Sequence, residues 1–268
     1  MTMSHRGVDA QRRVWTIGDY RTIARHLLPI SVETVGAIGL RAGDRVLDVG
    51  VGTGNAAIEA ARRGARVTGI DLTPAQIERA RARCASEGVD VELRVGDAED
   101  LDVADAGFDI VLSVMGVIFA PDHRRATAEL ARACRPGGTV AITTWADGGW
   151  SSRWRSRAAR LLPASSPGGP MPDEWGDPDE AVRRFAAAGL HATVTKHAFE
   201  FRFDSVETAL EVFVSAAGPF VQFMEAAAAL RRGPEALDEL RAALVESNQA
   251  DDGTCRVPAP YLLVVARR

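Results

Sequence analysis

The turn Gly50-Val-Gly-Thr-Gly54 is the sequence feature that most constrains the fold of this chain. It follows the β-branched run 45–49, typical of a buried strand, and precedes a helical pattern at 55–63. This order presents backbone N–H groups and a helix N-terminus to a ligand. The glycine spacing differs from that of a dinucleotide fingerprint, and no Gly-Lys-Ser or Gly-Lys-Thr of a phosphate loop is present. On its own, the turn is also compatible with a purely structural role.

Short apolar runs continue to alternate with longer helical patterns as far as Trp145. Expected strands after the first are 66–70, 91–95, 108–114 and 139–145, with helices at 74–86 and 122–134 between them. Strands alternating with helices of this length pair in parallel, and runs so rich in Val and Ile are covered on both faces. The pattern therefore predicts a doubly wound, Rossmann-like α/β fold.

The pattern changes on both sides of this core. We expect two helices within 9–39, with Pro29 near their junction, and further helices at 152–162 and 179–188. The segment 205–249 is also expected to be helical, with breaks at Gly218-Pro219 and Gly233-Pro234. Strand character returns at 191–203 and at 255–266, the latter interrupted by prolines. We divide the chain into an N-terminal helical lid segment (1–40), an α/β core (41–147) and a region of cap helices with the last strands of the sheet (148–268). Residues 1–40 and 148–250 are expected to fold over the carboxyl edge of the sheet as a helical lid.

Polar residues stand at the ends of successive predicted strands. Asp71 follows the second strand, Asp97 the third, and Ser113 lies at the end of the fourth. In open parallel sheets, ligands bind at the carboxyl ends of the strands, so these residues are expected to form parts of one site. A carboxylate in the position of Asp71 can accept hydrogen bonds from both hydroxyls of a ribose. Each acid taken singly is equally compatible with a loop or helix-cap role, but the ordered set favours a site.

The chain resembles the class I S-adenosylmethionine-dependent methyltransferases in several short segments. These are Val46-Leu-Asp-Val-Gly-Val-Gly-Thr-Gly54, Val67-Thr-Gly-Ile-Asp71, Gly96-Asp97-Ala98, Phe108-Asp-Ile-Val111 and Arg135-Pro-Gly-Gly138. The resemblance is nearest to the branch that contains quinone, sterol and bacterial natural-product methyltransferases. It implies a seven-stranded, mostly parallel sheet whose last strand is antiparallel, and S-adenosyl-L-methionine as the cofactor.

The resemblance also implies roles for individual residues. Gly50, Gly52 and Gly54 would approach the methionine part of the cofactor, and Asp48 would help to place its amino group. Asp71 would bind the ribose, and Leu72 would pack on the adenine. Asp97 and Ala98 would hold the adenine edge, and Ser113 would offer its backbone carbonyl.

The sequence says less about the residues that bind the methyl acceptor than about those that bind the cofactor. Met115 and Trp145, at the ends of the fourth and fifth strands, and Tyr20 are expected to contact the substrate. An O-methylation favours a base near neutral pH, and His123 lies nearest the fourth strand end. The residues Pro121 and Asp122 equally predict a helix start, which would leave His123 in an exposed first turn. The family also contains enzymes that bind the cofactor but catalyse a non-methyl reaction such as cyclisation, and the motifs do not separate the two.

Composition narrows the class of partner. The formal net charge of −4 argues against a nucleic-acid ligand, and the turn after Ser113 lacks the Asn-Pro-Pro-Tyr type of motif found in many nucleobase and protein-glutamine methyltransferases. Three isolated cysteines predict neither disulfides nor a metal site. No apolar run indicates a signal core or a membrane span. We therefore expect a cytoplasmic enzyme with a small-molecule acceptor, no metal, no membrane partner, and no oligomeric state indicated.

Overall fold

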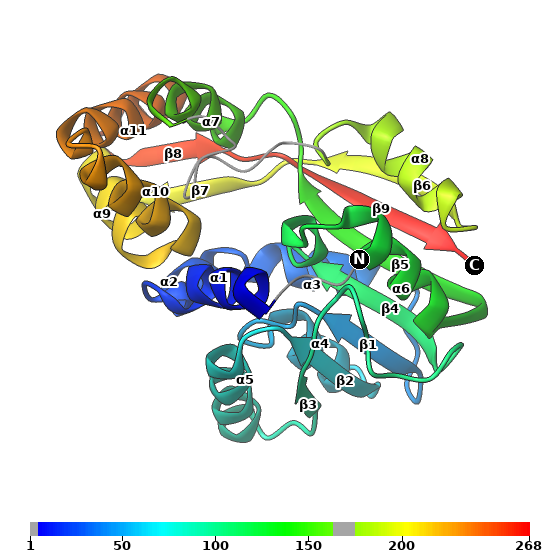
Figure 1. Ribbon diagram of the computed structural model, residues 1–268. Helices are drawn as coiled ribbons and strands as arrows, with labels where there is room; N and C mark the ends of the chain where they lie inside the picture. Colours follow the sequence, from blue (N-terminus) through cyan, green and yellow to red (C-terminus); the bar gives the residue numbers. More distant parts are fainter. Residues whose placement is uncertain (1–4, 163–174) are drawn as a thin grey trace. The chain divides into compact units, whose positions relative to one another are not determined.

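The computed structural model describes residues 5–162 and 175–268, and these form two compact units (Figure 1). The sheet unit contains residues 27–145, 175–197 and 261–268. The helical unit contains 5–26, 146–162 and 198–260. The chain therefore passes repeatedly from one unit to the other.

The sheet unit is built on a seven-stranded sheet with the order β3-β2-β1-β4-β5-β9-β6. Its strands are β1 (Arg45–Val49), β2 (Arg66–Asp71), β3 (Glu92–Val95), β4 (Phe108–Val114), β5 (Cys134–Trp145), β6 (His191–His197) and β9 (Tyr261–Arg267). Strands β1 to β5 pair in parallel, and β9 runs antiparallel between β5 and β6. The predicted doubly wound sheet with an antiparallel last strand is confirmed.

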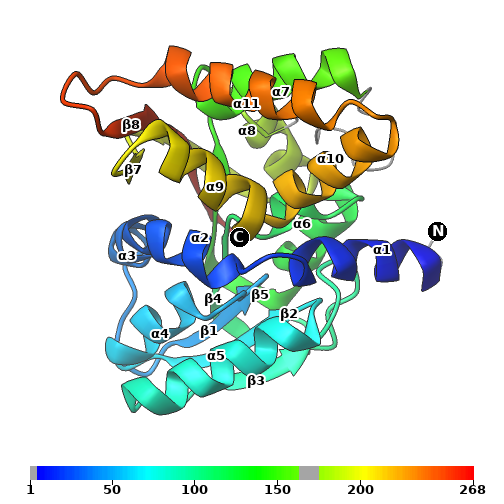
Figure 2. The same cartoon turned by 90° about the vertical axis from the view of Figure 1, so that its left-hand side faces the viewer.

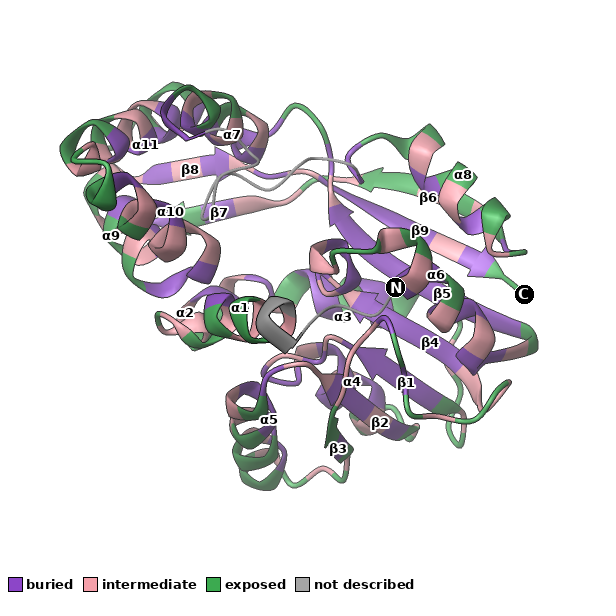
Figure 3. Ribbon diagram, viewed as in Figure 1, coloured by how far each residue is buried: buried purple, intermediate pink, exposed green. Residues whose placement is uncertain are grey.

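Five α-helices and one short 3-10 helix accompany the sheet in the described part of this unit. They are α3 (Leu28–Ala37), α4 (Asn55–Arg62), α5 (Pro74–Glu87), η1 (Val117–Phe119), α6 (His123–Ala133) and α8 (Pro178–Ala187). Small and branched apolar side chains of α3, α4 and α5 share one buried core with strands β1, β2 and β4. Figure 3 shows the central strands buried, whereas the helices also present exposed residues. Close packing of this kind fixes the strand ends that form the predicted site.

The helical unit combines six described helices with a two-stranded sheet (Figure 2). The helices are α1 (His5–Thr16), α2 (Tyr20–His26), α7 (Trp150–Leu161), α9 (Val206–Ala216), α10 (Gly218–Ala229) and α11 (Gly233–Ser247); the strands are β7 (Glu200–Phe203) and β8 (Cys255–Pro258). Aromatic rings form much of its core. Phe220 lies 5.4 Å from Trp150 and 4.4 Å from Trp154 between ring centroids, and Phe223 is buried beside them.

Three predicted elements differ from the structure. The segment 9–39 holds parts of three helices and not two. The junction expected near Pro29 lies at Leu27, and the additional break lies at residues 17–19, where Gly18 has a φ of +76°. The predicted strand 191–203 is two strands, β6 and β7, in different sheets. The predicted strand 255–266 likewise divides into β8 and β9. Ala259 and Pro260 separate them, and the backbone N–H of Ala259 donates to the Phe199 carbonyl at 2.8 Å.

Within the described residues, no single helix has the length and apolar composition of a membrane span. Helices α9 and α10 meet those criteria only as a pair, and the pair is bent by 85°.

Candidate cofactor site

The loop between β1 and α4 is held against the end of β2. The backbone N–H groups of Gly50 and Val51 both donate to the Ile70 carbonyl, at 2.8 Å and 3.0 Å. Gly50, Gly52 and Gly54 have φ values of +74°, +54° and +90°, a region that side chains with a Cβ rarely adopt. The glycine spacing seen in the sequence therefore matches the backbone conformation of this loop.

The same loop makes a close backbone contact with the turn after β4. A Cβ added to Gly50 would lie 2.9 Å from the Gly116 Cα, and one added to Gly116 would lie 2.7 Å from the Val49 carbonyl oxygen. Only glycine allows the two turns to approach so closely. Gly116 was not among the residues predicted for the site.

The Ser113 side chain fastens these two turns together. Its buried hydroxyl donates to the Val49 carbonyl at 2.6 Å and accepts a hydrogen bond from the Val117 N–H at 2.9 Å. One side chain thus joins the end of β1 to the start of η1. The role predicted for the Ser113 backbone carbonyl stays a prediction.

Asp71 lies at the end of β2 and supports the glycine loop directly. One carboxylate oxygen accepts the Gly52 N–H and the other accepts the Thr73 N–H, each at 2.8 Å. Burial raises the pKa of this carboxyl, and the two backbone hydrogen bonds oppose that effect. The Thr73 side chain also interacts with this carboxylate. A carboxylate has about four acceptor directions in total, so Asp71 retains capacity for a further hydroxyl donor. Leu72, half-buried, follows Asp71 at the same strand end.

Asp48 is buried within β1, with 2% of its surface exposed. Burial raises its pKa from 3.8 to about 7; the backbone N–H of Ala57 opposes this shift and the charge of Asp71 adds to it. A buried carboxyl in this state gains stability from a cationic partner, because a positive charge would restore the ionised form.

The loop after β3 carries the predicted adenine-binding residues Asp97 and Ala98. Asp97 accepts the Glu99 N–H at 2.9 Å, and its backbone bridges to Asp100. Glu99 is buried, and its carboxylate accepts the Asp122 N–H at 2.8 Å. The loop is therefore internally ordered and tied to the start of α6.

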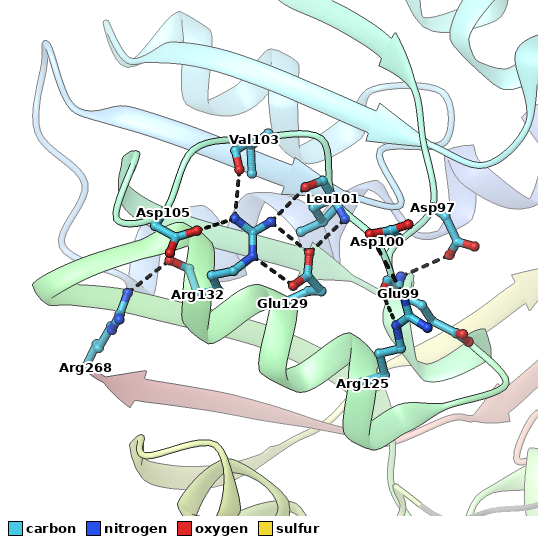
Figure 4. Close-up of polar contacts among 10 residues, drawn as sticks. All are labelled: Asp97, Glu99, Asp100, Leu101, Val103, Asp105, Arg125, Glu129, Arg132 and Arg268. Carbon is cyan, nitrogen blue, oxygen red and sulfur yellow. Dashed lines mark hydrogen bonds and ion pairs between the residues drawn. The ribbon is translucent and has the colours of Figure 1, made fainter. Parts of the chain in front are cut away.

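Helix α6 holds this loop through three charged side chains (Figure 4). Arg125 donates to the Glu99 carbonyl at 2.6 Å. Glu129 accepts the Leu101 N–H at 2.8 Å. Arg132 pairs with Glu129 and donates to the carbonyls of Leu101 and Val103, at 2.7 Å and 2.8 Å. Sequence reasoning missed this clamp, because Glu129 and Arg132 at an i, i+3 spacing resemble an ordinary exposed ion pair.

Comparison with known proteins agrees with this geometry. A model of a methyltransferase domain matches residues 46–138. Two uncharacterized proteins of Mycobacterium tuberculosis, Rv1403c and Rv1405c, are 43% identical over 169 residues and 35% identical over 214 residues. The first match covers 63% of this chain and 62% of the relative's length, and the second covers 79% and 78%.

Two further proteins carry informative names. The 27-O-demethylrifamycin SV methyltransferase of Amycolatopsis mediterranei is 40% identical over 110 residues, which is 40% of either chain. The solved structure of the YcgJ protein from Bacillus subtilis shares the fold, with a TM-score of 0.62 at 19% identity, covering 91% of this chain and 98% of that one. The chain belongs to the class I S-adenosylmethionine-dependent methyltransferase family.

The residues present fit the cofactor of this family. Asp48 offers a buried carboxyl that a cationic amino group would compensate, and Asp71 offers free acceptor directions for hydroxyls. The glycine loop adds a backbone turn with three positive φ values beside these two carboxyls. These are the donor and acceptor types that S-adenosylmethionine requires, although the individual contacts remain predictions.

On the predicted acceptor side, Met115 and Trp145 lie at neighbouring strand ends. Met115 has a φ of +52°, is buried, and donates its N–H to the Thr143 hydroxyl at 3.0 Å. Trp145 is half-buried at the end of β5. Tyr20 begins α2 in the helical unit, where its ring meets Trp15 edge-on at 5.8 Å. Their contacts with a substrate stay predictions.

His123 is the first residue of α6. Asp122 caps this helix by accepting the Arg125 N–H at 2.9 Å, which confirms the predicted helix start. The His123 side chain is half-buried: Nε2 lies 3.1 Å from the Ile118 carbonyl oxygen, and the ring packs against Trp175 at 5.3 Å. These contacts give the His123 side chain a structural role in packing the start of α6. Its role as a catalytic base stays a prediction.

Proposed function

We propose that this protein binds S-adenosylmethionine and transfers its methyl group to a small-molecule acceptor. The observation that carries the proposal is the position of the Asp71 carboxylate at the carboxyl edge of the sheet, where ligands of this fold bind. This carboxylate accepts hydrogen bonds from the backbone of Gly52 and Thr73 and retains capacity for a further donor. Family membership supports the same cofactor.

The cofactor, when bound, supplies a methyl group already activated on a sulfonium centre. The protein's contribution is therefore mainly to bind, orient and exclude water. In this proposal Asp71 binds the ribose hydroxyls, Asp48 orients the amino group, and the loop at Asp97 holds the adenine edge. The clamp of α6 residues keeps that loop ordered before the cofactor arrives.

The proposed acceptor is an apolar metabolite of the natural-product kind. Support comes from the 27-O-demethylrifamycin SV methyltransferase, whose name identifies such a substrate for that enzyme, and from the net negative charge of this chain. A polyanionic acceptor would require an excess of basic side chains. A cytoplasmic location belongs to the same proposal and is supported by the three cysteines, which are free and buried.

Isotope transfer tests this proposal. The protein is incubated with methyl-labelled S-adenosylmethionine and a metabolite extract, and products are followed by mass spectrometry. A small molecule that gains one labelled methyl group, and does so only with active protein, is the expected result. Binding of the cofactor without any labelled product from extracts of several natural-product-forming bacteria would contradict methyl transfer and favour the non-methyl reaction considered from the sequence.

A further inference from the structure

Met115, the first residue after β4, has a backbone conformation that residues with side chains rarely adopt. Its φ is +52°. Of the described residues other than glycine, Ala106 and Arg231 also have a positive φ, but Ala106 is half-buried and Arg231 is exposed, whereas Met115 is buried. Glycine would adopt this φ without strain, and the chain places glycine at the next position, Gly116. The strain therefore falls on a residue whose side chain lies inside the protein.

The hydroxyl of Thr143 holds Met115 in this conformation from the neighbouring strand. Thr143 is fully buried in β5, where it pairs with Val114 in the register of the two parallel strands. Its hydroxyl accepts a hydrogen bond from the Met115 N–H at 3.0 Å. A valine in place of Thr143 would have nearly the same shape but would leave that buried N–H without its acceptor. Thr143 thus fixes the backbone of the first residue beyond β4.

The other side of Met115 is fixed against the glycine loop. Gly116 approaches Gly50 so closely that a Cβ added to Gly50 would lie 2.9 Å from the Gly116 Cα. Met115 therefore stands between two fixed points, the Thr143 hydroxyl on β5 and the glycine loop after β1. Residues with strained backbones persist where the surrounding structure determines their conformation in this way, and they are concentrated at active sites.

We propose that Thr143 is a positioning residue for methyl transfer, which holds Met115 at the place where the acceptor meets the methyl group. This inference rests on the proposed function, because it takes the glycine loop as part of the cofactor site. Met115 lies at the carboxyl edge of the sheet, one residue from the contact with that loop. A methionine side chain is unbranched and polarizable, which suits the irregular surface of an apolar acceptor. In-line transfer requires accurate placement of the acceptor atom, so a displaced Met115 slows the reaction.

Threonine variants of the full-length protein test this role. Thr143→Val removes the hydroxyl, and Thr143→Ser keeps it. Thr139→Val is the matched control, because Thr139 is a buried threonine earlier in the same strand whose hydroxyl accepts a hydrogen bond from Arg267. Calorimetry measures cofactor binding. The rate of label transfer from methyl-labelled S-adenosylmethionine to a product of the metabolite extract measures catalysis, and urea unfolding establishes that each variant is folded.

We expect Thr143→Val to lower kcat about tenfold while its dissociation constant for S-adenosylmethionine stays within about threefold of the parent value. Thr143→Ser should recover most of the rate, and Thr139→Val should match the parent. If Thr143→Val does not fold, Met115→Gly carries the test, because glycine adopts the same φ without the side chain and should lower kcat similarly.

Three results would overturn the proposal: a parental rate in folded Thr143→Val, an equal loss in Thr143→Ser, or an equal loss in Thr139→Val. Weaker cofactor binding that accounts for the whole loss would also overturn it, because Thr143 would then serve the cofactor and not the acceptor. If the unaltered protein binds the cofactor but labels no product, the proposed function fails, and this inference fails with it.

Discussion

Asp71 accepts a hydrogen bond from the backbone N–H of Gly52 at 2.8 Å, so the residue proposed to bind the ribose also shapes the loop proposed to hold the methionine part. The two halves of the proposed cofactor site are thus coupled through one carboxylate. A change at Asp71 is expected to affect both.

Ser113→Ala removes a hydroxyl that serves the ends of two strands. The variant leaves the Val49 carbonyl and the Val117 N–H without their partner in a buried position. We expect a loss of about 1–3 kcal/mol in the free energy of unfolding, measured by urea denaturation. The control is Thr34→Val, whose lost hydroxyl donates only to the Ile30 carbonyl of its own helix. This variant should lose less of the free energy of unfolding. Equal costs would contradict the assigned role of Ser113.

Gly50→Ala tests the close approach of two turns. The new Cβ would meet the Gly116 Cα at 2.9 Å in addition to the strain of a positive φ. Gly43→Ala is the control, since its φ of +90° is equally unfavourable but nothing lies within 4 Å of an added Cβ. Gly50→Ala should therefore lower the free energy of unfolding by about 1–3 kcal/mol more than the control does, and its melting temperature should be correspondingly lower. A similar loss in both variants would show that conformation alone, and not the contact, requires Gly50.

Asp48 should make stability depend on pH. Its folded-state pKa of about 7 is raised from 3.8, so the folded chain holds this proton more tightly than the unfolded chain. Between those values the contribution of Asp48 to stability falls as pH rises, and it is lost once pH passes the folded-state pKa. Asp48→Asn should therefore stabilise the protein without cofactor more at pH 8 than at pH 5, as followed by urea unfolding. If Asp48→Asn changes the free energy of unfolding by the same amount at pH 5 and at pH 8, the pKa of Asp48 is not raised.

Arg132→Met tests the clamp on the loop after β3. The variant loses hydrogen bonds to the Leu101 and Val103 carbonyls, so the loop that carries Asp97 should become mobile. We expect S-adenosylmethionine binding about tenfold weaker by calorimetry, equivalent to about 1.4 kcal/mol. Arg183→Met, which breaks a similarly spaced pair with Glu180 on α8, should leave the affinity unchanged. Unaltered binding by Arg132→Met would mean that the loop does not need this clamp.

The order of the central elements could be predicted because each carries its own local signal. The alternation of strands and helices around Asp48, Asp71 and Asp97 predicted both the sheet and the common edge on which these residues lie. The breaks at residues 17–19 and at Ala198 were missed, since a turn of two or three residues leaves the apolar pattern on either side almost unchanged. Prolines marked the interruption between β8 and β9, but they did not indicate that the two strands belong to different sheets.

The contacts that could not be predicted from the sequence are tertiary ones. The two hydrogen bonds of the Ser113 hydroxyl depend on how β1 and β4 end beside each other, which no spacing reveals. Glu33 is hydrogen-bonded to His197 and Tyr261, which both lie more than 160 positions further along the chain. Such contacts follow from the register of the assembled sheet, not from local propensity.

Calorimetric titration with S-adenosylmethionine tests the central claim most directly. The unaltered protein should bind it with a micromolar dissociation constant, and Asp71→Ala should weaken binding about 100-fold, because charge-assisted hydrogen bonds worth about 1.5–3 kcal/mol each are lost. Asp90→Ala, which removes an exposed acid of the same unit, should bind like the parent. Absence of binding by the unaltered protein, or equal binding by Asp71→Ala, would contradict the account.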